Sequence, residues 1–206
     1  MYRKLCLVVA LVVCFVAGIA QAGLITTIER RNSTNTAPQI AGPLANGSLC
    51  YVDRTPATHP PGGHQYMNLP TDLLGGDYVM VANADRTVAT YELDVTLAQA
   101  CTLSLFIDNR VGDNDRTTPP TLGNGVMDWV ANNGFVSTDV KLSIDEKGDG
   151  TIDNDFTMYS KQVPAGKITL YQQNAGSLNM YGSAVPEPAT VALLGLGALT
   201  LLRRRK

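Results

Sequence analysis

The feature that most constrains the fold is a series of short β-prone runs separated by Gly, Pro, Asn and Asp. In the clearest of them, Thr90–Leu97, apolar and polar residues alternate at every second position. A period of two places one set of side chains in a core and the other in solvent, as in an antiparallel sheet. No segment of the middle of the chain keeps a helical period over several turns. The pattern therefore predicts an all-β fold.

The runs that predict strands are 24–29, 49–53, 78–82, 88–97, 102–107, 140–144, 156–159, 167–172 and 178–184. They do not alternate with helical segments, so we expect an antiparallel β-sandwich. Residues 102–107 repeat the alternation of 90–97 after the short link 98–100, which predicts a hairpin. The segment 31–48, rich in Asn, Thr, Pro and Gly, is expected to be a long surface loop.

One local pattern narrows the kind of sandwich. Val163–Leu170 consists of a Val-Pro-Ala-Gly turn that leads into a β-prone run. This layout resembles jelly-roll carbohydrate-binding modules, in which such turns commonly precede a core strand. The resemblance implies a jelly-roll-like sandwich domain over residues 23–184.

The N-terminal end has the three parts of a secretory signal peptide. Tyr2–Lys4 is a basic start, Leu5–Ile19 is nearly all apolar, and Ala20–Ala22 is an A-x-A cleavage site. This arrangement predicts a signal peptide over residues 1–22, with Gly23 as the first mature residue. A retained membrane anchor is the alternative. Cleavage is favoured because the apolar core is short and a small-residue site follows it.

The C-terminal end also has three parts in order. A Pro-Glu-Pro box comes first, then an apolar run from Ala189 to Leu202, and then a basic cluster. The box is Val185, Pro186, Glu187 and Pro188, and the cluster is Arg203, Arg204, Arg205 and Lys206. This order closely resembles the PEP-CTERM sorting signal of bacterial surface proteins. The resemblance implies that an exosortase, a membrane-embedded transpeptidase, recognises residues 185–206, removes them and passes the protein to the cell exterior.

The apolar run of this tail predicts a short transmembrane helix. Its fourteen residues cover roughly 21 Å as a helix, against about 30 Å of hydrocarbon core. Basic side chains that extend to the interface, and local thinning of the bilayer, make transient insertion into the inner membrane feasible. The four positive charges hold that end in the cytoplasm and leave the body outside. A simple tail anchor is the alternative, and the box favours sorting. We expect export, anchoring until the tail is processed, and then a cell-surface or extracellular location.

Removing both ends changes the charge balance. The whole chain has a formal net charge of −2. The body keeps ten basic and seventeen acidic residues, which gives a net charge of about −7. An acidic body argues against nucleic acid and anionic lipid headgroups as partners. It is compatible with divalent cations and with neutral or cation-bridged polysaccharide.

The body also keeps two of the four cysteines, Cys50 and Cys101. Both lie in strand-like segments of a chain expected to be exported, where disulfides persist. A bond between them closes a loop of about fifty residues and adds roughly 4 kcal/mol of stability. The pattern predicts this disulfide, with two buried free thiols as the alternative.

The densest acidic segment is 145–153. It resembles the calcium loops of EF-hands and dockerins, which place oxygen ligands at alternate positions around a glycine. The residues that match ligand positions are Asp145, Asp149, Thr151 and Asp153. Lys147 stands at another ligand position, and Phe156 replaces the usual Glu at position twelve. Calcium is one interpretation. A solvated turn between strands is the other, because Asp and Gly favour turns for backbone reasons.

Trp129 is the only tryptophan, and it lies in the Gly- and Asn-bounded segment 125–133, outside any clear strand alternation. This segment is expected to be one helical turn or a covering loop. An aromatic ring with a polar edge suits a wet ligand that has an apolar face, such as a pyranose ring. We therefore treat Trp129 as the candidate that stacks on a sugar. A core position is the alternative.

The sequence gives little support to catalysis. It contains no G-x-S-x-G elbow, no P-loop and no H-E-x-x-H. We expect a non-enzymatic body that acts by binding or by structure at the cell surface or in an extracellular matrix. The PEP-CTERM family is associated with bacteria that make exopolysaccharide, so the resemblance implies a polysaccharide partner. The alternative is a secreted polysaccharide hydrolase, which needs two converging carboxylates in a cleft.

Overall fold

The computed structural model describes residues 23–173, 176 and 178–187. Over these residues the chain forms ten strands, two short 3-10 helices and one helical turn. The strands are β1 (Ile25–Arg31), β2 (Gln39–Ala41), β3 (Gln65–Met67), β4 (Asp77–Met80), β5 (Glu92–Leu97), β6 (Cys101–Asp108), β7 (Val136–Asp145), β8 (Asn154–Val163), β9 (Gly166–Tyr171) and β10 (Gly182–Val185). The helical elements are η1 (Thr71–Leu73), η2 (Asn83–Thr87) and α2 (Trp129–Asn132).

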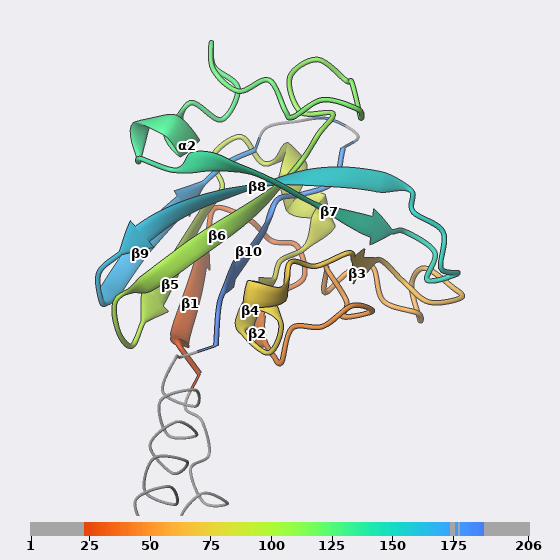
Figure 1. The fold of residues 1–206 in the computed structure, drawn as a ribbon, viewed down its shortest axis with the longest axis horizontal. Coiled ribbons are helices and arrows are strands. Elements are labelled where there is room, and N and C mark those ends of the chain that lie inside the picture. The colour runs from red at the N-terminus through yellow and green to blue at the C-terminus, as the bar shows by residue number, and fades with distance from the viewer. Residues whose placement is uncertain (1–22, 174–175, 177, 188–206) are drawn as a thin grey trace, which may run out of the picture.

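Two sheets pack against each other as a β-sandwich (Figure 1). The smaller sheet has the strand order β1-β5-β9, and the larger has the order β2-β4-β10-β6-β8-β7-β3. Every pairing between these strands is antiparallel. The prediction of an all-β, antiparallel sandwich is confirmed.

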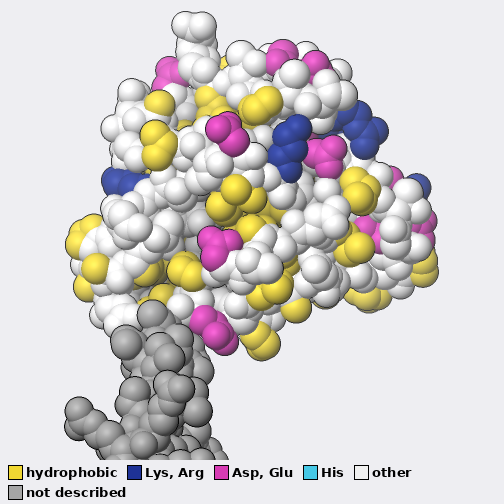
Figure 2. Space-filling model, viewed as in Figure 1, with side chains coloured by type: hydrophobic (Ala, Val, Ile, Leu, Met, Phe, Trp, Pro, Cys, Tyr) yellow, Lys and Arg dark blue, Asp and Glu magenta, His cyan; other side chains and the backbone are white. Residues whose placement is uncertain are grey.

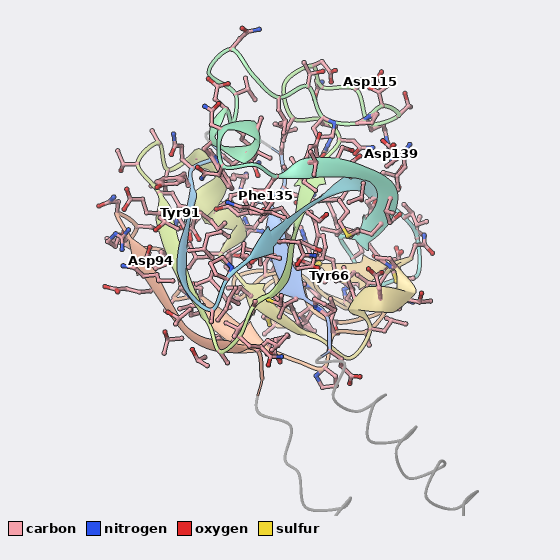
Figure 3. The ribbon with its side chains drawn as sticks, turned by 60° about the vertical axis from the view of Figure 1, so that its left-hand side comes forward. Tyr66, Tyr91, Asp94, Asp115, Phe135 and Asp139 are labelled. Atoms are coloured by element: carbon pink, nitrogen blue, oxygen red, sulfur yellow. The ribbon has the colours of Figure 1, made fainter. Side chains whose placement is uncertain are left out.

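The core lies between the two sheets and is filled from both. The alternation in β5 places Leu93 and Val95 in it, both fully buried. Figure 3 shows Tyr66, Tyr91 and Phe135 inside the body, and all three are buried. Burying apolar area at about 25 cal/mol per Å² is the main source of stability in such a core. The predicted inward face of this strand is therefore correct.

The outward face of β5 is less exposed than the alternation predicts. Asp94 is buried because Arg31 of β1 and two residues of β9 close over it. Lys167 Nζ donates to its carboxylate at 2.9 Å, and Thr169 Oγ1 donates at 2.6 Å. The Arg31 guanidinium, followed by these two donors, holds the pKa of Asp94 well below its usual range despite the opposing effect of burial. Polar and charged side chains from all three strands of the smaller sheet thus form one cluster around Asp94 on its outer face.

The predicted hairpin between β5 and β6 is wrong. β5 lies between β1 and β9 in the smaller sheet, whereas β6 lies between β10 and β8 in the larger. Both edges of β5 are occupied, so no edge is left for β6 to pair with. Residues 98–100 instead carry the chain from one sheet to the other. The Val-Pro-Ala-Gly turn makes the return crossing from β8 to β9, so it leads into a strand as expected.

Two other segments differ from the prediction. Residues 49–53 form no strand, because Leu49 and Tyr51 make only isolated bridges. The expected loop 31–48 contains β2 and is tied to η2 by side chains. Ser33 Oγ and Asn35 Nδ2 donate to Asp85 Oδ1 at 2.5 and 2.7 Å. Hydrogen bonds to a buried carboxylate thus fix the part of this segment that precedes β2.

The described body begins and ends at the same pole. β1 starts beside the end of β10, and Gly23 and Glu187 line one hollow (Figure 1). We call this pole, made by Gly23, Gly75–Asp77 and Val185–Glu187, the terminal end. α2 lies at the other end of the body in both ribbon views (Figures 1 and 3). On the face shown in Figure 2, the Lys and Arg side chains lie away from the terminal end.

Candidate functional site

Trp129 is held in one orientation at the start of α2. Its Nε1 donates to the backbone oxygen of Gln172 at 2.9 Å. Its ring centroid lies 5.6 Å from that of Tyr181, 5.9 Å from that of Tyr171 and 6.2 Å from that of Phe135, each tilted or edge-on. These separations fall within the range of favourable aromatic pairs. The ring is half-buried, with other aromatic rings packed on it.

A hollow of about 270 Å³ lies beside this ring. Its lining consists of Gly125, Met127, Asp128, Trp129, Gln172 and Gln173. An aromatic ring next to amide and carboxylate groups provides both an apolar surface and hydrogen-bonding groups for a ligand. The volume is slightly below the roughly 300 Å³ at which drug-sized sites begin. The hollow is thus suited to one small ring rather than to a large ligand.

The loop that forms one wall of the hollow has an unusual backbone. Asp128 Oδ2 accepts the N–H of Gly125 at 3.0 Å, and residues 123 and 126 are bridged by two backbone hydrogen bonds. Gly125 has a φ of 94°, and Met127, a bulky residue, has a φ of 50°. Left-handed backbone at such a residue is costly and is concentrated at ligand sites. The helical turn itself was one of the two forms expected for this segment.

The opposite wall is fixed by a buried amide. Gln173 is almost fully buried, and its Nε2 donates to the backbone oxygen of Asn179 at 2.8 Å. Its Oε1 accepts the N–H of Tyr181 at 2.8 Å. The Tyr181 hydroxyl donates to the backbone oxygen of Tyr171, and burial raises the pKa of this phenol well above its usual value. Both walls of the hollow are therefore held by hydrogen bonds before any ligand binds.

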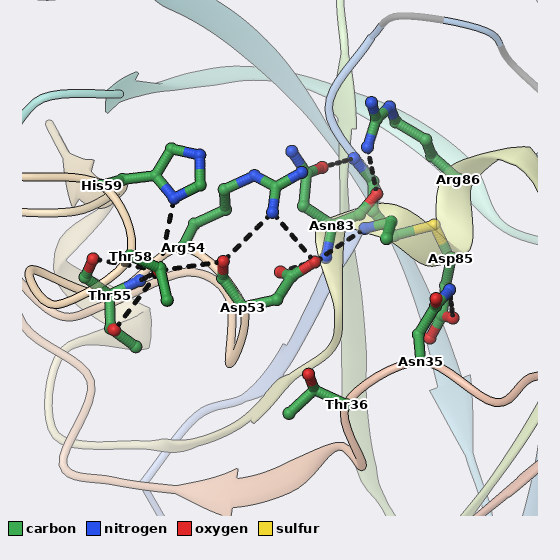
Figure 4. A network of polar contacts seen from close by, with 12 residues as sticks. Asn35, Thr36, Asp53, Arg54, Thr55, Thr58, His59, Asn83, Asp85 and Arg86 are labelled. Carbon is green, nitrogen blue, oxygen red and sulfur yellow. Dashed lines mark hydrogen bonds and ion pairs between the residues drawn. The ribbon is translucent and has the colours of Figure 1, made fainter.

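Through Asn179, Gln173 is linked to a polar network, part of which Figure 4 shows. Asp53 accepts the N–H groups of Asn83 and Ala84 at 2.7 and 3.0 Å. Asn83 Oδ1 accepts the N–H of Met180 at 2.8 Å, and its Nδ2 donates to Asn179 Oδ1 at 3.3 Å. These residues come from segments at least thirty positions apart, so no local pattern in the sequence could have identified them.

Asn179 connects this network to two carboxylates. Its Nδ2 donates to Glu146 Oε1 at 2.8 Å, and its N–H donates to Asp108 Oδ2 at 3.1 Å. Arg110 pairs with Asp108 through two hydrogen bonds of 2.9 and 2.6 Å. That bidentate pair raises the pKa of the Arg110 guanidinium. Asp108 therefore forms an ion pair with Arg110 and also accepts a backbone N–H of the segment that precedes β10.

Of the four predicted calcium ligands, Asp145 ends β7 and the other three lie in the turn that leads to β8. Asp145 is 1% exposed, and its carboxylate accepts the N–H groups of Lys147, Gly148 and Gly150 at 2.9, 2.6 and 2.6 Å. Burial acts to raise the pKa of Asp145, and these backbone donors outweigh it, so the pKa lies below its usual value. Both carboxylate oxygens are thus already occupied by the backbone.

The other predicted ligands in this turn also face backbone groups. Asp149 Oδ1 accepts the N–H of Thr151 at 2.9 Å, and Asp153 Oδ2 accepts the N–H of Glu146 at 2.9 Å. Lys147 Nζ lies 3.7 Å from Asp153 Oδ1. Among the described residues no three His, Cys, Asp or Glu side chains gather as a metal site. The observed geometry is that of the hydrogen-bonded turn, and calcium binding stays a prediction.

The predicted disulfide is corrected by the structure, in which Cys50 and Cys101 are both free. Cys101 begins β6 and faces Val163, whereas Cys50 is buried beside Asp145, beyond the other end of that strand. The seven-residue length from Cys101 to Asp108 is roughly 23 Å. A disulfide needs Cα atoms within about 7 Å of each other. Burial raises the pKa of the Cys50 thiol well above its usual value, so the thiol is also unreactive.

The sorting box begins inside the fold. Val185 is the last residue of β10 and pairs with Asp77 of β4, and Pro186 and Glu187 continue from it. Pro188, the apolar run 189–202, the basic cluster and the expected signal peptide 1–22 lie outside the described residues. Within the part of the chain that is described, no helix has the length and apolar character needed to cross a bilayer.

Comparison with known proteins gives one result for the tail and one for the body. Residues 184–206 match the family model of the PEP-CTERM protein-sorting motif. No curated protein matches the chain by sequence. The body is similar in structure to a β-glucuronidase from glycoside hydrolase family 2, with a TM-score of 0.53 and 13% identity. The match covers 77% of this chain and 14% of the enzyme, so the chain spans about a seventh of that protein. At this identity the likeness shows only a similar fold over the matched part.

Proposed function

We propose that this protein is exported, is sorted through its C-terminal tail by an exosortase-type transpeptidase, and acts outside the cell as a non-catalytic polysaccharide-binding module. The sorting half of the proposal rests on the motif at 184–206. The binding half rests on the preformed hollow beside Trp129. This hollow is the observation that carries the function of the body.

The position of the hollow supports this division of roles. The sorting box leaves the body at the terminal end, and Trp129 lies at the other end with α2 (Figure 1). While the tail is in the membrane, the terminal end faces the bilayer and the hollow faces away from it. A matrix polymer reaches the hollow both before and after the tail is removed.

The charges favour a neutral polysaccharide. The body carries a net charge of about −7, and Asp128 lies at the rim of the hollow. An anionic polymer is repelled by both, because like charges at short range raise the free energy of the complex. Gln172 and Gly125 are among the uncharged residues that line the hollow, and amide and backbone groups of this kind suit sugar hydroxyls.

Affinity electrophoresis of the full-length protein in mild detergent tests the proposal. The gels contain barley β-glucan, xylan, galactomannan or alginate. We expect at least one of the three neutral polymers to retard the protein and alginate to leave it unaffected. Gln172→Ala removes an amide from the hollow and should reduce the retardation about tenfold, as loss of one hydrogen bond of about 1.4 kcal/mol does. Gln162→Ala makes the same change on β8, where the amide donates to Thr102 Oγ1, and should behave as the wild type.

The alternative function, hydrolysis of polysaccharide, is an outcome of the same experiment. Incubation with each polymer is followed by measurement of released reducing sugar. The binding proposal predicts none. Release that disappears when one Asp or Glu is replaced would establish the hydrolase instead.

A further inference from the structure

The described part of the sorting box, Val185–Glu187, lies against the folded body. Val185 forms a strand pair with Asp77, which fixes the first residue of the box. A Cβ atom placed on Gly76 would overlap the carbonyl oxygen of Val185 and would lie 3.1 Å from Pro186 Cα. A Cβ atom on Gly75 would lie 2.5 Å from Glu187 Oε1. At Gly76 the overlap is with backbone and requires glycine, whereas at Gly75 an added Cβ would displace the Glu187 side chain.

These residues form a seat for the box. Gly75 has a φ of 85°, which glycine adopts without strain, and its N–H donates to the backbone oxygen of Leu44 at 2.8 Å. Gly76 in turn accepts the N–H of Leu44 at 2.9 Å. Two backbone hydrogen bonds to Leu44 therefore hold Gly75 and Gly76 in place. The Glu187 side chain lies across it, and the open part beside it is a hollow of about 540 Å³.

The chain leaves little room between this seat and the membrane. Only three residues separate Val185 from Ala189, where the apolar run begins. Fully extended, that connection spans at most about 14 Å. A transpeptidase that binds the box as an extended peptide must therefore work between a packed strand and the bilayer. The seated box is not available to it on the side that faces Gly75 and Gly76.

We propose that the seat formed by Gly75 and Gly76 gates the processing of the tail, so that the transpeptidase acts only on molecules whose box has left the body. The gate rests on the proposed sorting function. The rate of processing is then the intrinsic rate multiplied by the unseated fraction. Contacts of the seat with Glu187 lower that fraction, and their loss raises it.

A glycine substitution tests the gate in the full-length protein. The protein is produced in a host that carries an exosortase, and the conversion of precursor to product is followed by intact mass spectrometry. Gly75→Ala displaces the Glu187 side chain, and we expect processing about fivefold faster than in the wild type. The matched control is Gly150→Ala, since Gly150 has a φ of 87° and no atom near the added Cβ. The control strains the backbone equally and should be processed at the wild-type rate.

A second variant tests the gate without changing either glycine of the seat, so any loss of stability at Gly75 does not affect it. Insertion of Gly-Ser-Gly-Ser between Val185 and Pro186 leaves every strand intact and moves the box away from the seat. The gate predicts faster processing of this variant too. Equal rates for the wild type, Gly75→Ala and the insertion would overturn the gate while leaving sorting intact. A wild-type chain that is never processed would instead contradict the sorting function itself.

Discussion

The terminal end and the tryptophan end of this body are built in opposite ways. At the terminal end, Gly75 and Gly76 bring backbone against backbone, and any added side chain overlaps Val185 or Glu187. At the tryptophan end, the site consists of the ring of Trp129 and of the side-chain groups around it. Packing at the terminal end therefore requires glycine, which has no side chain, whereas the site at the tryptophan end requires the side chain of Trp129.

This difference suits the two ends to different roles, one to hold a segment of the same chain and the other to bind an external ligand. A surface that must hold and release a segment of its own chain gains from bare backbone, because such contacts are close and involve little side-chain ordering. A surface that recognises an external ligand needs a rigid apolar ring and fixed polar groups. Substitutions at the two ends should therefore differ in what they change first.

The largest effect is expected at the terminal end. Gly76→Ala forces the new methyl group onto the Val185 carbonyl, where neither backbone can move freely. We expect the free energy of unfolding to fall by about 4 kcal/mol. Urea denaturation of the full-length protein measures it, with Gly176→Ala as the control, because its Cβ meets no atom within 4 Å. Equal midpoints for the two variants would show that the box is not packed on Gly76.

The next effect is expected at the tryptophan end. Trp129→Ala removes a half-buried ring that contacts three others, and we expect a loss of about 3 kcal/mol. Trp129→Phe retains most of the ring contacts and loses only the bond to Gln172, so its cost should be about 1 kcal/mol. Trp129→Ala should lose polysaccharide retardation in the gel, and Trp129→Phe, which keeps an aromatic ring, should retain part of it. Retention of binding by Trp129→Ala would move the ligand site elsewhere.

The turn from β7 to β8, which holds Asp145, belongs to neither end and has a third role, that of a hydrogen-bonded connection. Asp145→Ala leaves three backbone N–H groups of its turn without their acceptor, and we expect a loss of about 2 kcal/mol. If the carboxylate serves only the backbone, calcium and then excess chelator should leave the melting temperature of the wild type unchanged. A calcium-dependent rise of several degrees would identify a metal site in the turn.

The smallest effect is a pH dependence that both ends should share. Burial is the main cause that lowers the pKa of His64, with His59 and Arg54 acting in the same direction and Glu146 and Asp53 opposing them. The folded state keeps His64 neutral, while the unfolded chain takes up a proton below about pH 6.5. The unfolded state then binds more protons, so stability falls as the pH drops from 7.5 to 5.5.

The measurement for this effect is the unfolding midpoint across that pH range, compared with His64→Gln. The variant should lose most of the dependence. Tryptophan emission reports on the tryptophan end, and amide hydrogen exchange of Val185 reports on the terminal end. Coincident shifts of the two probes would indicate one cooperative unit, and divergent shifts would show that the two ends unfold separately.

The sequence predicted what is periodic or local. The alternation in β5 gave the correct inward face, and the helical turn at Trp129 is one of the two forms, turn or covering loop, that its Gly- and Asn-bounded segment predicted. The tail was identified because its three parts are contiguous and in order. Such features need no knowledge of which segments meet in space.

Long-range pairing could not be predicted in the same way. The crossing at 98–100 has the length of a hairpin link, and only the occupied edges of β5 prevent that pairing. The distance between Cys50 and Cys101 depends on how the segment that holds Cys50 is placed relative to β6, which begins at Cys101. The amides of Asn83, Gln173 and Asn179, which support the site, carry no local signal. Their roles follow from segments that the sheets bring together.

The central claim, that the body binds polysaccharide through the hollow at the tryptophan end, has a direct measurement. Trp129 is the only tryptophan, so the emission of the full-length protein reports on this hollow alone. The protein is titrated with the neutral polymer that retards it most in the gel, in the presence of acrylamide as quencher. The account predicts a saturable shift in emission and protection from quenching. Unchanged emission and quenching at polymer concentrations that retard the protein would contradict it, because binding would then occur away from Trp129.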